Sequence, residues 1–210
     1  MKLFLRTFAV LLLVGCGNPD PAATFDEMEG SLLAASQVSF DFAVTAEGVI
    51  EGNFTGSVET SADGTLALRS TGNFIGRDLE MEMATDGDSL RMVTTEMSDA
   101  LPNPPETFKA MVIGLTRMGI MHNLAALSTV SPPEHSDGGI EEWVTVGNFE
   151  SGQVGEHDGV AFNIFVDGDR TSDVTLAIVD GLPVLRRQVV QFPGGEMIVT
   201  EEYSNFRVVK

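Results

Sequence analysis

Large apolar side chains alternate with polar or small ones in the segment Val38-Ser39-Phe40-Asp41-Phe42-Ala43-Val44. Successive side chains of a β-strand point to opposite faces, so the two valines and two phenylalanines share one face while Ser39 and Asp41 occupy the other. This pattern predicts a strand with one buried and one solvated face, which is typical of antiparallel sheets. The sheet that contains this strand must therefore be covered on one side by other elements.

The same alternation returns further along the chain, between short turn sequences. Apolar residues keep one phase across 50–58 and 79–83, and glycine-containing pairs such as Asp63-Gly64 separate the runs by roughly ten residues, as consecutive hairpins require. We expect five strands between residues 38 and 96. Five more are expected at about residues 141–149, 159–167, 172–179, 182–192 and 196–208.

Two helical regions are expected outside these strands. Thr24 or Asp26 is a suitable cap for a helix that runs to about Ser36. After a proline-rich loop at 101–105, residues 106–127 are apolar on nearly all sides, which predicts helix covered by other elements. Glycine weakens a helix, so we expect the two glycines of this segment, Gly114 and Gly119, to divide it into shorter helices.

The N-terminal segment has the organisation of a secretory signal. Lys2 and Arg6 precede an apolar run at 8–14, which is too short for a membrane span of ~20 residues. The segment Leu13-Val14-Gly15-Cys16 then resembles the lipobox of bacterial lipoproteins, in which the signal is cut before the cysteine and the thiol is diacylated. The alternative, an ordinary signal peptide followed by a buried free cysteine, leaves the single cysteine of the chain without a purpose in an oxidising compartment.

These features predict a signal peptide at 1–15, a lipidated Cys16 with its tether at 16–23, and a single domain at 24–210. Loss of the signal removes two basic residues and no acidic one, so the formal net charge of −19 becomes −21. Such a field repels nucleic acid and anionic headgroups, which excludes a nucleic-acid partner and leaves membrane attachment to the acyl chains. Gly17 stands where an aspartate retains enterobacterial lipoproteins in the inner membrane, and this resemblance implies an outer-membrane protein that faces the periplasm.

The closing segments of the chain are similar to those of the LolA/LolB-like superfamily of lipoprotein carriers, which includes mycobacterial lipid-carrying lipoproteins. The similarity lies in Asp180-Gly181-Leu182-Pro183, in Leu185-Arg186-Arg187 and in the run from Val199 to Phe206. It implies an α+β fold in which a large curved antiparallel sheet, a half-open β-barrel of about ten to eleven strands, has helices covering its concave face and an apolar cavity between them. Because the chain has a lipobox, it resembles the membrane-tethered members of the superfamily more than the soluble carrier. Arg117 is the nearest position, by location, to the arginine that holds the lid of that carrier.

Known catalytic and metal-binding motifs are absent from the sequence, including those of serine hydrolases, zinc proteases, phosphate-binding loops and EF-hands. His122, His135 and His157 are far apart in sequence, which favours packing or exposure over a shared metal site. The two Asp-Gly-Asp segments at 86–88 and 167–169 are interpreted as hairpin turns in preference to calcium ligands. We therefore expect no enzymatic activity, no catalytic residue, no metal and no cofactor.

Methionines in the predicted strands and in the second helical region suggest a soft, adaptable apolar surface. The leading hypothesis is a membrane-anchored lipoprotein that binds an acyl chain, a lipid or a lipidated protein between sheet and helices. The alternative is a structural or protein-interaction lipoprotein of the envelope with a closed core and no ligand. The expected lining, which also describes a filled core, is Phe40, Phe42, Phe54, Met81, Met83, Met111, Leu115 and Met118.

Overall fold

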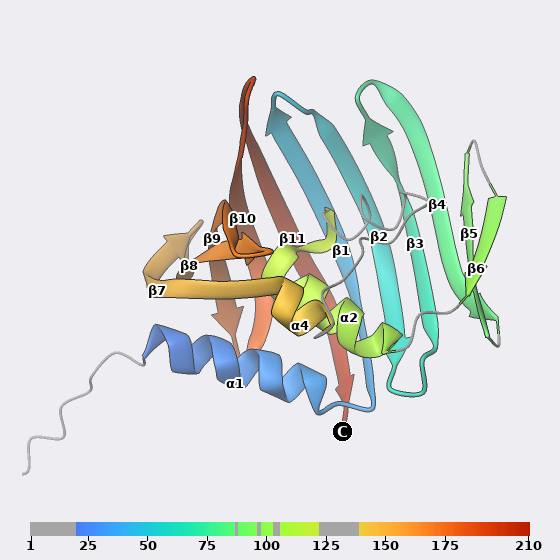
Figure 1. Cartoon of the computed structure of the whole chain (residues 1–210), viewed down its shortest axis with the longest axis horizontal. Coiled ribbons are helices and arrows are strands. Elements are labelled where there is room, and N and C mark those ends of the chain that lie inside the picture. Colours follow the sequence, from blue (N-terminus) through green and yellow to red (C-terminus); the bar gives the residue numbers. More distant parts are fainter. Residues whose placement is uncertain (1–19, 87, 96–97, 103–105, 122–138) are drawn as a thin grey trace, which may run out of the picture.

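The computed structural model describes residues 20–210 except 87, 96–97, 103–105 and 122–138. Its eleven strands form one open antiparallel sheet in the order β6-β5-β4-β3-β2-β1-β11-β10-β9-β8-β7. The sheet curves around the helices that lie against its concave face (Figure 1). The first and last strands of the chain pair in the middle of the sheet, so the two halves of the sequence form one continuous layer. The predicted fold class is confirmed.

The first half of the sheet is a meander of consecutive hairpins. Its strands are β1 Gln37–Gly48, β2 Gly52–Ser61, β3 Leu66–Phe74, β4 Arg77–Asp86, β5 Ser89–Thr94 and β6 Ser98–Pro102. The first five confirm the five predicted strands. The sixth was not expected, because Pro102 was assigned to a loop. Pro102 instead ends an edge strand, a position that tolerates the missing N–H of proline.

The second half is built in the same way. Its strands are β7 Val144–Val154, β8 His157–Val166, β9 Asp169–Val179, β10 Leu182–Phe192 and β11 Gly195–Val209. β7 begins later than predicted because Ile140–Trp143 form a short helix, α4. Asp167 and Gly168 both have positive φ angles, of 52° and 83°, and Val166 pairs with Asp169 across them, as in a two-residue hairpin turn. This geometry supports the interpretation of that Asp-Gly-Asp segment as a turn.

The N-terminal helix, α1, spans Pro21–Leu33 and so begins earlier than predicted. Asp20 is its cap in place of Thr24 or Asp26, and its carboxylate accepts a hydrogen bond from the Ala22 N–H at 3.2 Å. Proline suits the first position of a helix, since the amide hydrogen it lacks has no partner there. The predicted tether therefore includes residues that belong to the helix. Phe25, Met28 and Leu32 of α1 are buried against the sheet.

The second helical region lies in the middle of the chain and connects the two halves of the sheet. α2 spans Thr107–Ile113, and a π-helical turn, η1, continues it over Gly114–Met118. Gly119 ends this turn with a φ of 84°. The predicted interruption at the two glycines is therefore confirmed, while residues 122–127 of the expected region lie outside the described residues. The segment 107–121 is called the insertion below.

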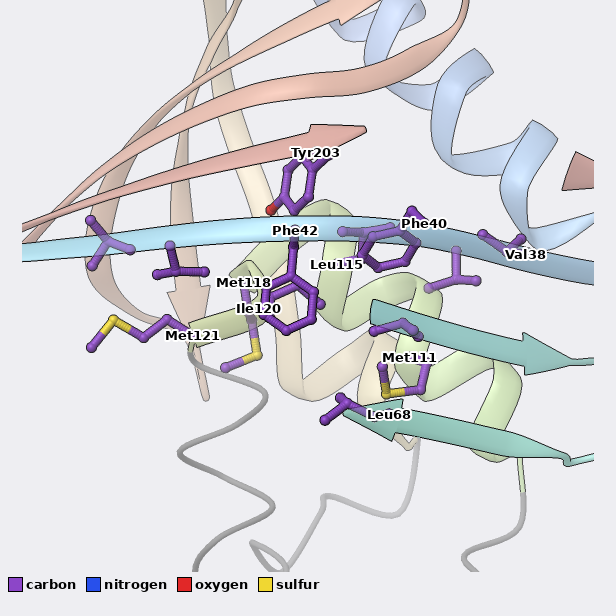
Figure 2. Close-up of a cluster of buried hydrophobic side chains, with 14 of the residues drawn as sticks. Val38, Phe40, Phe42, Leu68, Met111, Leu115, Met118, Ile120, Met121 and Tyr203 are labelled. Atoms are coloured by element: carbon purple, nitrogen blue, oxygen red, sulfur yellow. The ribbon is translucent and has the colours of Figure 1, made fainter. Parts of the chain in front are cut away.

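The core fills the space between the concave face of the sheet and the insertion. Figure 2 shows Met111, Leu115 and Met118 of the insertion opposite Phe40 and Phe42 of β1. The alternating residues of the other face, such as Glu80 and Glu82 of β4, are exposed as expected. Within the described part of the chain, each helix is too short or too polar to cross a bilayer.

Candidate functional site

The predicted lining residues lie together on the two sides of the interface between sheet and insertion. All eight are buried, with exposed fractions between 1% for Met83 and 8% for Met118, and all belong to one cluster. Phe40, Phe42 and Phe54 come from β1 and β2, and two methionines come from β4. In the described structure these side chains pack against one another, and their role as a ligand lining stays a prediction. Cys16 lies outside the described residues.

A large groove of about 880 Å³ lies on the outer face of the sheet instead. Its floor consists mainly of residues that alternate with the buried ones in β1, β2, β3 and β11, and most of them are polar. They include Ser39, Asp41, Ser57, Glu59, Arg69, Asn205 and Arg207. Of the eight predicted lining residues, only Phe40 also borders this groove, which therefore differs from the apolar interface that the sequence predicts.

A cluster of polar side chains is buried beneath the insertion, on the concave face of β9, β10 and β11. Its members are Ser172, Arg186, Gln188, Glu201 and Tyr203, which are between 0% and 5% exposed. We call these five residues the buried polar cluster. Arg186 of β10 and Glu201 of β11 are direct cross-strand partners in the sheet, so the cluster places opposite charges side by side.

Arg186 binds the insertion through backbone carbonyls. Its Nη1 donates to the carbonyl of Thr116 at 3.1 Å and its Nη2 donates to that of Arg117 at 2.5 Å. Its Nε donates to Oε1 of Gln188 at 3.2 Å, and Gln188 in turn donates to the Ser172 hydroxyl. Carbonyls at the end of a helical segment carry partial negative charge, so a cation stabilises this end of η1.

Glu201 binds the next residues of the insertion through backbone amides. The N–H groups of Ile120 and Met121 each donate to one of its carboxylate oxygens at 2.9 Å, and the hydroxyl of Tyr203 also donates to it. A Cβ on Gly119 would lie 2.6 Å from Oε2 of Glu201 and 2.9 Å from Nε of Arg186. Only glycine fits here, because the Glu201 carboxylate and the Arg186 guanidinium lie too close to the backbone of residue 119 to leave room for a Cβ.

A second charged pair holds the insertion from the side of α1. Glu29 is 7% exposed, and its carboxylate accepts hydrogen bonds from Thr116 Oγ1 at 2.6 Å and from Nε and Nη2 of Arg117 at 2.9 and 2.7 Å. Nη1 of Arg117 donates to the carbonyls of Glu141 and Val144. Arg117 thus fastens the insertion to α1 and to the start of β7. The carbonyls of the insertion itself are bound by Arg186.

Burial changes the proton affinity of the cluster. It lowers the pKa of the Arg186 guanidinium, an effect that Coulomb interactions with Tyr203 and Glu201 oppose. It raises the pKa of Tyr203 well above 10, and the neighbouring Glu201 carboxylate adds to the increase. The raised pKa favours the protonated form of Tyr203, which donates its hydroxyl hydrogen to Glu201.

Tyr203 is the only tyrosine of the chain, so its ionisation is directly measurable. Below pH 10 both folded and unfolded chains keep the phenolic proton. Above pH 10 only the unfolded chain loses it, so stability falls as pH rises. We expect the 295 nm absorbance of tyrosinate to appear together with the loss of circular dichroism, well above pH 10. Tyrosinate that forms at pH 10 in the folded protein contradicts this assignment.

Sequence reasoning assigned no individual role to Arg186, Glu201 or Tyr203. A signal was nevertheless present. Glu201 is in phase with Met197, Val199 and Tyr203, so the alternation of β11 sends a carboxylate to the buried face. Arg186 was harder to place, because a register irregularity between Pro183 and Leu185 changes the phase of β10. The sequence signal for this cluster is a charged residue at a strand position that alternates in step with buried apolar residues.

Metal binding finds no support among the described residues, which contain no group of three His, Cys, Asp or Glu side chains placed to hold an ion. His157 is exposed at the start of β8. His122 and His135 lie outside the described residues. The buried polar cluster has one acid and one base, each already bonded to backbone groups, which suits the holding of a segment.

The fold and its insertion define a class of protein, namely an open curved sheet with helices on its concave face. Solved structures with similar folds match the chain, and LolA superfamily proteins are among them. LprF from Mycobacterium bovis matches with a TM-score of 0.43 at 13% identity, over 90% of this chain and 95% of that one. A LolA superfamily protein, NE2245 from Nitrosomonas europaea, has a TM-score of 0.39 at 7% identity, over 90% and 94%.

A MucA/MucB complex from Pseudomonas aeruginosa also matches, with a TM-score of 0.39 at 10% identity, over 90% of this chain and 57% of that one. No family model and no curated protein sequence matches the chain. At these identities the likeness concerns the fold alone.

Proposed function

We propose that this protein is a lipoprotein of the cell envelope that binds a hydrophobic ligand between the concave face of its sheet and the insertion. The ligand classes are an acyl chain, a lipid or a lipidated protein. One observation carries the proposal: the insertion covers a methionine-rich apolar face but is fastened to β10 and β11 through its backbone, by Arg186 and Glu201. An apolar layer held by a few polar bonds at one end is suited to separation from the sheet.

The free energy gained by burying an acyl chain is similar to that gained by burying the apolar side chains of the insertion. A fully buried Leu or Met side chain contributes about 1.5–3 kcal/mol, and each methylene of an acyl chain contributes about 0.8 kcal/mol. About ten methylenes therefore replace the burial of roughly four side chains such as Met111, Leu115 and Met118. Methionine is flexible and polarizable, so the same surface accommodates either the insertion or a ligand of variable shape. Binding of this kind is loosely specific.

Attachment to the membrane is proposed through acylated Cys16. A single acyl chain binds a bilayer only reversibly, whereas two or three chains hold a globular domain there stably. The proposed location is the outer membrane, facing the periplasm, after cleavage before Cys16. Growth with a labelled fatty acid tests the anchor: the wild-type protein should take up the label and the Cys16→Ser protein should not.

Ligand binding is tested with the purified protein after removal of bound lipid. We expect a fluorescent fatty acid to bind with saturation and unlabelled lipid to compete for the site. Mass spectrometry of protein that has not been delipidated should show copurified lipid. Met111→Glu places a charge at the interface and should abolish binding, whereas Glu80→Gln on the outer face is the matched control and should leave it unchanged.

The second function, a structural or interaction lipoprotein with a closed core, is favoured by the dense packing of the eight predicted lining residues. It predicts neither fatty-acid binding nor copurified lipid. That pair of negative results, in protein shown to be folded by circular dichroism, overturns the ligand-binding proposal.

A further inference from the structure

Three hairpin turns lie side by side at the end of the sheet farthest from α1 (Figure 1). They connect β10 to β11, β1 to β2 and β3 to β4. Backbone hydrogen bonds join neighbouring turns: Val49 N–H donates to the Glu196 carbonyl at 3.1 Å, and Ile75 N–H donates to the Glu51 carbonyl at 2.9 Å. The three turns therefore form one continuous rim.

Each turn presents a large apolar side chain to solvent. Phe192 is 38% exposed, Val49 is 45% exposed and Ile75 is 64% exposed. They are three of the five large hydrophobic residues that are exposed in the described part of the chain. We call these three residues the tip row. Their concentration on one rim is unlike the scattered apolar residues of an ordinary surface.

Ile75 occupies a position that its own turn disfavours. Ile75 and Gly76 form the two-residue turn between Phe74 and Arg77, with φ angles of 51° and 74°. Turns with two positive φ angles prefer Asn-Gly, and a β-branched residue with positive φ is strained. Ile75 is also the most exposed member of the tip row, so packing within the chain does little to offset this strain. Packing within the described chain therefore does not account for isoleucine at this position.

The shape and charge of the rim identify its partner. A stable protein interface buries roughly 800 Å² on each side, far more than three separate tips provide. Apolar side chains can enter the interfacial region of a bilayer without a complementary surface. Lipid also requires that backbone groups be hydrogen-bonded within the protein, and the N–H groups of Val49 and Ile75 are. A second copy is disfavoured because Glu51 and Glu196 beside the tips would face their own counterparts. The same carboxylates disfavour anionic lipid.

We propose that the tip row docks the domain on a zwitterionic lipid bilayer, with the side chains of Val49, Ile75 and Phe192 in the interfacial region. This docking surface is separate from the interface between sheet and insertion, and it does not depend on an acyl group at Cys16.

Vesicle flotation tests the proposal with a chain that begins at Gly17 and so lacks both the signal segment and Cys16. All contacts described above lie within residues 20–210, and circular dichroism verifies the fold. We expect this protein to float with phosphatidylcholine vesicles and to bind phosphatidylglycerol vesicles more weakly. Val49→Ser, Ile75→Asn and Phe192→Ser combined should lower the bound fraction at least about tenfold. Val179→Ser with Val209→Ser, the other exposed hydrophobic residues, should leave it unchanged.

Ile75→Asn alone separates docking from folding. Asparagine is favoured in this turn, so the variant should be at least as stable as the wild-type protein and should still bind vesicles several-fold more weakly. The proposal is overturned if the Gly17 chain does not float, if the triple variant floats as well as the parent, or if phosphatidylglycerol binds more tightly. Concentration-dependent dimerisation that Ile75→Asn abolishes also overturns it, in favour of a second copy.

Discussion

Replacement of Arg186 by methionine is expected to lower the free energy of unfolding by about 3–5 kcal/mol, since it leaves Glu201 as an uncompensated buried charge. The carbonyls of Thr116 and Arg117 lose their donors at the same time. Methionine keeps most of the side-chain volume, so a packing defect contributes little. The measurement is denaturant unfolding monitored by circular dichroism, with the slope of the transition compared between variants.

Arg187 provides the control for this substitution. It is the next residue of the same strand but is exposed on the other face. Arg187→Met should change stability by less than about 0.5 kcal/mol, as surface substitutions usually do. Adding Glu201→Gln to Arg186→Met should recover part of the loss, because it removes the charge that was left unpaired. Equal effects of Arg186→Met and Arg187→Met contradict the assigned role of Arg186.

Gly119→Ala is expected to release the end of the insertion from the sheet. Its φ of 84° is strained for alanine, and the new Cβ would lie 2.6 Å from Oε2 of Glu201 and 2.9 Å from Nε of Arg186. Strain and overpacking together should cost about 3 kcal/mol or more. Because the clash involves charged groups that hold the backbone of the insertion, relief requires the insertion to move. Hydrogen exchange should increase in residues 107–121 and remain slow in β1 and β11.

Gly168→Ala is the matched control, because Gly168 has a nearly identical φ of 83° but has no atom within 4 Å of the position of a Cβ. It should cost only the conformational strain, about 1–2 kcal/mol, without faster exchange in the insertion. Under the proposed function, Gly119→Ala should also bind the fluorescent fatty acid more tightly, since less work is needed to displace the insertion. Indistinguishable exchange in the two variants would show that the glycine has no special role in holding the insertion.

Local sequence patterns predicted most of the sheet. The alternation in β1 and the Asp-Gly turns depend on neighbouring residues alone, because strand geometry repeats every two residues and hairpins require particular turn residues. The same local patterns were misleading where two interpretations compete. Asp20-Pro21 was assigned to the tether although it starts α1, and Pro102 was assigned to a loop although it ends β6. In both cases proline occupies an end position that a helix or an edge strand tolerates.

The sequence also predicted which apolar residues are buried, including all eight of the expected lining, because burial follows from the phase of a strand or helix. It did not predict what holds the insertion in place. Arg186 is 70 residues from Thr116, and Glu201 is 81 residues from Ile120. No local pattern indicates that these pairs meet, and the irregularity in β10 conceals that Arg186 points inward.

The period of two along each strand, the turn residues and the glycines of the insertion are properties of the chain itself. The sequence alone therefore determined antiparallel hairpins with one apolar face and an interrupted helical cover. The pairing of β1 with β11 joins the two halves of the sheet and brings β10 and β11 beneath the insertion. Tertiary structure therefore decided that opposite charges are buried around Gly119 and that three apolar turns share one rim. Both arrangements depend on strand order and register between distant segments, which pairing energies across the whole sheet determine.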